Sequence, residues 1–173
     1  MNILAISGSL RTASLNTKLV YALKEAAPPE FNLSVFEGIG NLPHFNPDLD
    51  GDEPLGTVQV WRKALQAADG IILCTPEYAN GVPGVLKNAL DWIVSSGEFV
   101  DKPTAVISAS PLATGAEKAH DSLLLTLRMM TASIVGSSRI GSVNKKLDAD
   151  GVWIDEELRS ELSGLIGSLS INK

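Results

Sequence analysis

The sequence has one cysteine, few aromatic residues and no long apolar run. Because Cys74 is the only cysteine among the 173 residues, no disulfide can form within the chain and a reducing compartment is expected. No apolar run approaches the roughly 18 residues that a membrane-spanning helix needs. The apolar run at residues 2–7 is too short for a secretory signal and lacks a basic flank. These absences predict a cytoplasmic protein without a membrane segment.

Positive charge is also scarce. The chain has 14 Lys and Arg against 20 Asp and Glu, which gives a net charge of −6. A nucleic-acid-binding protein needs a basic surface to neutralise phosphates, so nucleic acid is not expected as a partner. The two histidines, His44 and His120, lie far apart in the sequence and indicate neither a metal site nor a His-based triad. His120 falls in an expected helix and is interpreted as a surface or interface residue.

Apolar runs alternate with amphipathic ones along the chain. Runs that fit strands span residues 2–7, 32–37, 70–75, 103–110 and 132–136. Helical patterns span residues 15–27, 56–68, 84–95, 116–130 and 155–169. Such alternation predicts right-handed crossovers and a parallel sheet with helices on both faces. The expected fold is one α/β domain over residues 1–173, a three-layer sandwich around a five-stranded parallel sheet in the order 2-1-3-4-5.

Two irregular stretches interrupt this alternation. Residues 38–54 hold three of the nine prolines and are long for a connection. They are expected either to cover a site or make a contact, or to be a solvated excursion. Residues 137–152 are expected to connect the fifth strand to the last helix.

Ligands bind such a sheet at the carboxyl ends of its strands, near the switch in strand order. The first segment at that edge, residues 7–17, carries several hydroxyl side chains and Arg11 before a helix. Unpaired N–H groups and the positive end of a helix dipole suit a phosphate, although small polar residues here are also ordinary helix caps. The segment is neither a Walker A loop nor a G-x-G-x-x-G loop, which argues against a nucleoside triphosphate and a tightly held dinucleotide.

Two further segments follow neighbouring strands. Residues 75–84 form a stiff, proline-containing loop that would present backbone groups to a flat ligand, with Tyr78 available for a ring contact. Glu77 is a candidate general acid or base, although a Glu at such a position more often accepts backbone hydrogen bonds or meets a basic residue on a partner. Residues 108–117 would form the third wall of the same site.

Three strings together resemble the NADPH-dependent FMN reductase family. They are "GSLRTASLN" after the first strand, "PEYANGVPGVLKNALDWI" after the third, and "SASP" with a downstream glycine after the fourth. Members of this family are flavodoxin-like and include quinone, azo-dye and chromate reductases. The resemblance implies FMN as the cofactor, NADPH or NADH as the electron donor and a small-molecule electron acceptor. It also implies a homodimer or a homotetramer.

The resemblance assigns roles to matching positions. The FMN phosphate would be held by Ser9, Arg11, Ser14, Asn16 and Thr17. The isoalloxazine ring would lie against Pro76, Glu77, Tyr78 and Asn80, largely through backbone contacts. Ser110 and Gly115 would face the ribityl chain or the other edge of the ring. No side chain then needs to act as a catalytic acid or base, because FMN carries the chemistry.

The ring-binding loop departs from the family pattern. The family usually has Asn directly after P-E-Y, then a variable residue and then Ser, whereas this chain has Ala79, Asn80 and Gly81. An Asn side chain at position 79 and a Ser hydroxyl at position 81 are therefore missing. If the contacts of this loop are mostly main chain, FMN still binds; otherwise its affinity falls or its redox potential shifts.

The leading functional hypothesis is an enzyme that passes a hydride from NAD(P)H through flavin N5 to a quinone, a flavin or a similar acceptor by a ping-pong mechanism. The first alternative is a flavodoxin-type electron carrier, whose ring is usually sandwiched between aromatic side chains. The aromatic content of 5% argues against it. The second alternative is a family member with weakened or lost FMN binding that acts as a binding protein.

Overall fold

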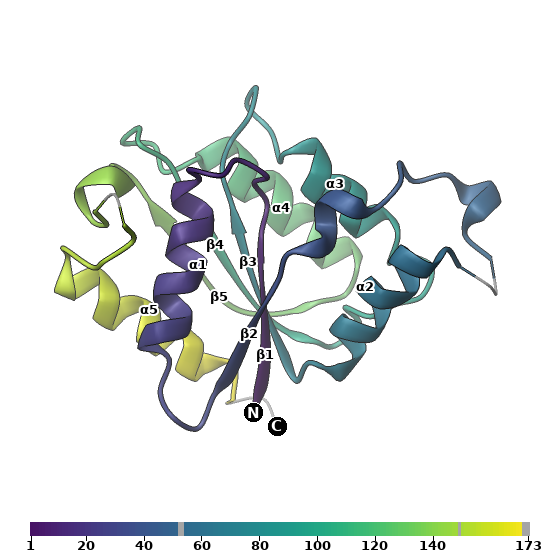
Figure 1. The fold of residues 1–173 in the computed structure, drawn as a ribbon, viewed down its shortest axis with the longest axis horizontal. Helices are drawn as coiled ribbons and strands as arrows, with labels where there is room; N and C mark the ends of the chain where they lie inside the picture. The colour runs from purple at the N-terminus through teal and green to yellow at the C-terminus, as the bar shows by residue number, and fades with distance from the viewer. Residues whose placement is uncertain (52–53, 149, 171–173) are drawn as a thin grey trace.

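The computed structural model describes residues 1–51, 54–148 and 150–170. It contains a five-stranded sheet in the order β2-β1-β3-β4-β5, and all four neighbouring pairs are parallel (Figure 1). The strands are β1 (Asn2–Ser7), β2 (Asn32–Phe36), β3 (Gly70–Thr75), β4 (Pro103–Ala109) and β5 (Ser133–Ile140). The expected α/β fold and strand order are confirmed.

Helices cover both faces of the sheet. The helices α1 (Leu15–Ala26) and α5 (Glu156–Ser168) pack on one face, and α2 (Gly56–Ala67), α3 (Gly84–Asp91) and α4 (Glu117–Met129) pack on the other (Figure 1). Alternate residues of β1 serve the two cores: Ile3 faces α1, and Leu4 faces α2. Because both faces are covered, β3 is buried along its whole length and has no polar alternation.

Two element boundaries differ from the sequence prediction by more than one residue. The strand β5 continues to Ile140, beyond the expected end at residue 136, because it pairs with β4 along the whole edge. The helix α3 ends at Asp91 rather than residue 95, because the Trp92 N–H bonds to the carbonyls of Asn88 and Leu90 and tight turns follow. The expected connection to α5 therefore begins after β5 at residue 141 and includes the short 3-10 helix η3 (Val143–Lys145).

The irregular stretch after β2 makes contacts with α2 and α3, although residues 44–49 within it are exposed. Its short helix η1 (Gly38–Asn41) buries Ile39, and η2 (Pro47–Leu49) follows. The carbonyl of Pro43 accepts a hydrogen bond of 2.8 Å from the Trp92 indole. Asp50 forms an ion pair of 2.5 Å with Arg62 of α2. The stretch thus connects α2 to the end of α3. Residues 52–53 of the stretch lie outside the described residues.

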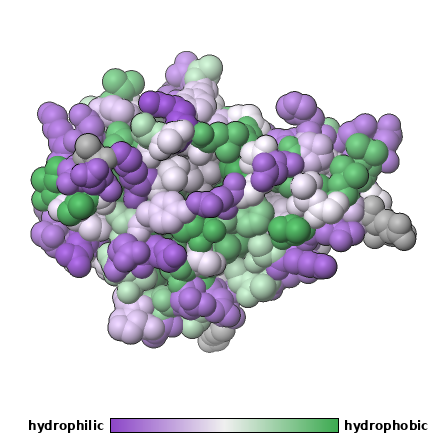
Figure 2. Space-filling model, in the orientation of Figure 1, coloured by the Kyte–Doolittle hydropathy of each residue, from purple (hydrophilic) through white to green (hydrophobic). Residues whose placement is uncertain are grey.

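The surface of this fold mixes polar and apolar residues. Figure 2 shows apolar residues framed by hydrophilic ones near the middle of one face, where β2 forms the edge of the sheet in Figure 1. No helix within the described ranges is long and apolar enough to cross a membrane.

Candidate functional site

A cavity of about 400 Å³ opens at the carboxyl ends of β1, β3 and β4, where the strand order switches. It is lined by Arg11, Ala13, Ser14, Leu15, Asn16, Pro76, Glu77, Tyr78, Ala109, Ser110, Pro111 and Leu112. Seven of the predicted site residues are among them, namely Arg11, Ser14, Asn16, Pro76, Glu77, Tyr78 and Ser110. The three loops thus meet where the topology predicts a ligand site, while the roles of the individual residues stay predictions.

The first loop leads into α1 with several donors unused. Ser14 is the N-cap, and its hydroxyl accepts from the Thr17 N–H at 3.3 Å. Within residues 12–16, the backbone N–H groups of Thr12, Ala13, Leu15 and Asn16 have no acceptor among the described residues. Ser14, Leu15 and Asn16 all line the cavity. Such a cluster at a helix start provides donors for an anion with several oxygens, as a phosphate has.

Asn16 joins three elements below this loop. Its side chain is buried, and Nδ2 donates to the Ala109 carbonyl of β4 at 3.0 Å. Its Oδ1 accepts from Sγ of Cys74 in β3 at 3.3 Å. Burial raises the pKa of the Cys74 thiol, so it remains a protonated donor. Both ends of the Asn16 amide are therefore committed to the protein, and its backbone N–H is the group left for a ligand.

The second loop is a two-residue β-turn. Tyr78 and Gly81 exchange backbone hydrogen bonds of 3.1 and 3.0 Å. Ala79 and Asn80 between them have φ values of 49° and 60°, which define a type I′ turn. The Tyr78 hydroxyl is 3.0 Å from the hydroxyl of Ser9 in the first loop. The turn thus fixes Tyr78 at the cavity, whereas Ala79 and Asn80 are exposed and do not line it.

Glu77 ties this turn to α4. Its Oε2 accepts from the Ala119 N–H at 3.0 Å, in the first turn of a helix whose N-cap, Ala116, supplies no side-chain acceptor. A carboxylate there is favourable because it meets unpaired N–H groups and the positive end of the helix dipole. Glu77 is therefore a backbone acceptor, the more common role expected for a Glu at this position.

The third loop is held by a buried pair that sequence reasoning missed. The Ser108 hydroxyl donates to the Gly115 carbonyl at 2.7 Å, and Nδ1 of His120 is 3.0 Å from the same hydroxyl. Because Ser108 has one proton and the carbonyl only accepts, we assign the Nδ1–H tautomer to His120. Burial lowers the pKa of His120, which favours the neutral ring. The expectation of a surface His120 is wrong, because α4 turns this side chain toward β4.

The remaining predicted residues lie around the cavity without lining it. Gly115 is buried at φ 63°, and a Cβ there would lie 3.1 Å from the Gly141 nitrogen, so it packs against the end of β5. The Thr17 hydroxyl is 2.8 Å from the Ser7 hydroxyl. Ser9 is buried and contacts Tyr78. Within the described residues, no group of His, Cys, Asp and Glu is arranged to hold a metal ion.

A second cavity of about 340 Å³ adjoins the first. It is lined by Leu10, Arg11, Tyr78, Pro83, Gly84 and Val85, so the two cavities share Arg11 and Tyr78. Arg11 is exposed and forms no ion pair with any carboxylate in the described ranges. A cation without a partner therefore stands between the two spaces.

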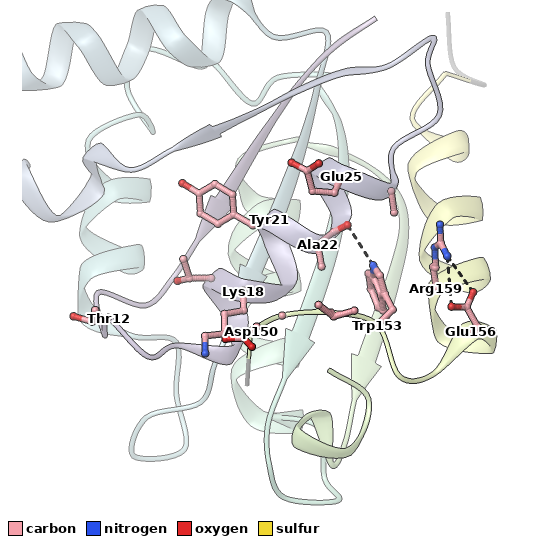
Figure 3. Close-up of a pocket in the computed structure, with 13 residues that line it drawn as sticks. Thr12, Lys18, Tyr21, Ala22, Glu25, Asp150, Trp153, Glu156 and Arg159 are labelled. Carbon is pink, nitrogen blue, oxygen red and sulfur yellow. Dashed lines mark hydrogen bonds and ion pairs between the residues drawn. The ribbon is translucent and has the colours of Figure 1, made fainter. Parts of the chain in front are cut away.

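A larger cavity, of about 650 Å³, lies elsewhere, between α1, residues 150–153 and the start of α5 (Figure 3). The Trp153 indole forms one wall and donates to the Ala22 carbonyl at 3.3 Å. Arg159 pairs with Glu156 at 3.2 Å. This cavity is outside the crevice at the strand ends, so its size does not make it the active site.

The fold and the crevice define a flavodoxin-like protein with a site for a phosphate-bearing ligand. The chain belongs to the NADPH-dependent FMN reductase family, whose family model matches residues 1–146. It is therefore an oxidoreductase that uses FMN and NAD(P)H, as the resemblance in the sequence implied. The residues present fit FMN, because the unused N–H groups at the start of α1 suit its phosphate and the open crevice lies beside them.

Similar proteins span nearly the whole chain. A 2-hydroxy-1,4-benzoquinone reductase of Burkholderia sp is 34% identical over 94% of this chain and 90% of its own length. An NAD(P)H-dependent FMN reductase of Pseudomonas aeruginosa is 30% identical over 99% of this chain and 94% of its own. The solved structure of the flavoenzyme NAD(P)H:(acceptor) oxidoreductase FerB from Paracoccus denitrificans has a TM-score of 0.83 at 30% identity, covering 99% and 96% of the two chains.

Proposed function

We propose that the protein is a quinone reductase that works by a ping-pong mechanism, with FMN bound in the crevice between the three loops. The observation that carries the proposal is the set of four unused backbone N–H groups in residues 12–16 beside the open cavity. Relatives named for the reduction of quinones, among them the Burkholderia protein, support a quinone as the acceptor.

The chain itself would bind and orient. FMN, when bound, supplies the hydride chemistry. The N–H groups of residues 12–16 and the Ser14 hydroxyl would hold its phosphate, with Arg11 close by. The loop residues Pro76, Glu77 and Tyr78 would place backbone groups along the ring, and Ser110 would close the opposite wall. Glu77 is engaged by α4 and His120 is buried below the loop, so neither is assigned a proton transfer.

The open mouth of the crevice supports the ping-pong order. Tyr78 and Leu112 line it and are 43% and 70% exposed. A donor and an acceptor can therefore reach the same side of the site in turn, with no need for both to be bound together.

The first experiment is a visible spectrum after adding excess FMN and removing the unbound fraction. Retained flavin that anaerobic NADPH bleaches, and that a quinone then reoxidises, is the expected result. Double-reciprocal plots of the steady-state rate against NADPH, at several fixed quinone concentrations, should give parallel lines. Retained flavin that NADPH cannot reduce would indicate an electron carrier instead. If no flavin is retained and free FMN supports no NADPH oxidation, the binding-protein alternative replaces the proposal.

A second experiment tests the phosphate site. Leu15 is the first residue of α1, where proline is tolerated, and Ser14 already has the extended conformation that proline requires before it. Leu15→Pro removes one unused N–H and should weaken FMN binding roughly tenfold or more, since hydrogen bonds to charged groups contribute about 1.5–3 kcal/mol. Leu15→Ala removes the side chain but keeps the N–H, so it is the matched control. Equal dissociation constants for the two variants would contradict this site.

The proposal also covers the state of the chain in the cell. We place it in the cytoplasm, as one domain that assembles into homodimers or homotetramers. Leu125 and Met129 lie one turn apart on α4 and are 66% and 60% exposed, which supports an interface on that helix. Light scattering during size-exclusion chromatography tests the assembly.

A further inference from the structure

The smaller cavity combines apolar walls with one cation. Leu10, Pro83 and Val85 supply aliphatic surface and Tyr78 supplies an aromatic ring. Arg11 is the only charged residue among the described residues that line this cavity. The protein carries a net charge of −6, yet this guanidinium has no ion-pair partner within the described residues. A ligand of complementary chemistry has a flat apolar body and one negative charge.

From this combination we infer that the smaller cavity receives the electron acceptor and that Arg11 selects quinones bearing an ionised oxygen on the ring. The guanidinium is planar and pairs with delocalised oxyanions through two parallel N–H groups. Because the cavity shares Tyr78 and Arg11 with the crevice, an acceptor there lies beside the proposed FMN site. The inference rests on the proposed quinone reductase function and adds the charge of the acceptor to it.

Arg11 is available for this role because the proposed phosphate site has other donors. Four backbone N–H groups and the Ser14 hydroxyl stand at the start of α1. Arg11 lines both spaces, so its guanidinium can contact an acceptor while the phosphate is held by the backbone. The first-named relative, a 2-hydroxy-1,4-benzoquinone reductase, acts on a quinone of this kind.

The charge balance gives Arg11 a second effect. A 2-hydroxyquinone is a vinylogous carboxylic acid and is an anion near pH 7. Its reduction takes one hydride from NAD(P)H, which carries both electrons, and two protons from water, and it yields NAD(P)⁺ and a neutral trihydroxyarene. The ion pair with Arg11 therefore exists with the substrate and is lost with the product, which favours product release.

The test compares two acceptors of similar shape, 2-hydroxy-1,4-naphthoquinone, an anion at pH 7, and neutral 2-methoxy-1,4-naphthoquinone. For each, kcat/KM is measured on the same FMN-loaded preparation of wild type and of Arg11→Gln. The ratio of the two values cancels any difference in FMN loading, and comparing ratios between proteins cancels the intrinsic reactivity of the quinones. The ratio should fall about tenfold in Arg11→Gln, as expected for loss of a charge-assisted hydrogen bond. Arg11→Lys should keep part of the preference.

Lys87 provides the matched control. It is an exposed cation in α3, paired with Asp91 at 2.5 Å, and it does not line the cavity. Lys87→Gln removes the same charge and should leave the ratio unchanged. Raising the ionic strength should lower the wild-type ratio and leave that of Arg11→Gln nearly constant, because salt screens an exposed pair.

Each outcome decides between the inference and its basis. An Arg11→Gln ratio equal to that of wild type, or an equal fall in Lys87→Gln, would overturn the selection by Arg11 while leaving the quinone reductase function intact. If NADPH bleaches the flavin of the loaded wild type but neither quinone is then reduced, the proposed function is overturned and the inference falls with it.

Discussion

Ala79 holds a backbone conformation that suits glycine or asparagine better. Its φ of 49° lies in the left-handed region, where a Cβ costs about 1–2 kcal/mol. Ala79→Gly should raise the free energy of unfolding by roughly 0.5–1 kcal/mol, after the greater freedom of glycine in the unfolded chain is subtracted. Urea denaturation measures this. Ala64→Gly, the same change inside α2, should destabilise, and a loss of stability at position 79 as well would contradict the turn assignment.

His120 links stability to pH. Burial lowers its pKa in the folded protein below the value of about 6.5 expected in the unfolded chain. The unfolded state therefore binds the proton more readily, and the free energy of unfolding should fall as pH drops from about 7.5 through 6.5 toward the folded pKa. Urea denaturation at pH 7.5 and 5.5 should show a smaller fall for His120→Gln than for wild type. If the free energy of unfolding falls by the same amount between pH 7.5 and 5.5 in His120→Gln as in wild type, His120 is not the source of the fall.

At the scale of elements, the Asn16 amide links α1 to β3 and β4 beneath the crevice. Asn16→Ala leaves the Ala109 carbonyl and the Cys74 thiol without their partner, and both are buried. Stranding a buried polar group costs about 1–3 kcal/mol, so the free energy of unfolding should fall by about that amount. Asn41→Ala, at an exposed position in η1, should change it by less than about 0.5 kcal/mol. Equal losses in chemical denaturation would contradict a special role for Asn16.

The elements themselves were largely predictable. Strands covered on both faces appear as apolar runs, so β3 and the strand order followed from the sequence. The extension of β5 did not, because Ser137 and Arg139 sit on an exposed edge and join the sheet through backbone pairing alone. Hydropathy records which side chains are buried and carries no signal for such pairing.

The site was predictable as three loops but not as a network. The hydroxyl-rich start of α1 and the turn after β3 carried local signals. The bonds from Asn16 to Cys74 and from Glu77 to Ala119 join residues 58 and 42 positions apart. Neither the pattern at the start of α1 nor that of the turn after β3 indicates which distant residue its side chain will contact. His120 was misplaced for the same reason, because a lone polar residue in a helix does not reveal which strand it meets.

For the whole molecule, the loops that line the crevice come from separate β–α units. A ligand that contacts all three should stabilise the native state by mass action, by about 2.7 kcal/mol at a free concentration near 100 times its Kd. We expect FMN to raise the melting temperature in differential scanning calorimetry. Riboflavin, which lacks the phosphate, should raise it much less at equal concentration. Equal shifts would show that the phosphate is not held at the start of α1.

The buried thiol of Cys74 gives the crevice a built-in reporter. Its side chain is 0% exposed and lies at the end of β3, beneath the first turn of α1. A thiol reagent can reach it only when this part of the fold opens. In the closed form the raised pKa also keeps the thiol protonated, which slows its reaction further. Because the chain has no second cysteine, the labelling rate of the native protein follows the local opening equilibrium of the crevice without any engineered probe.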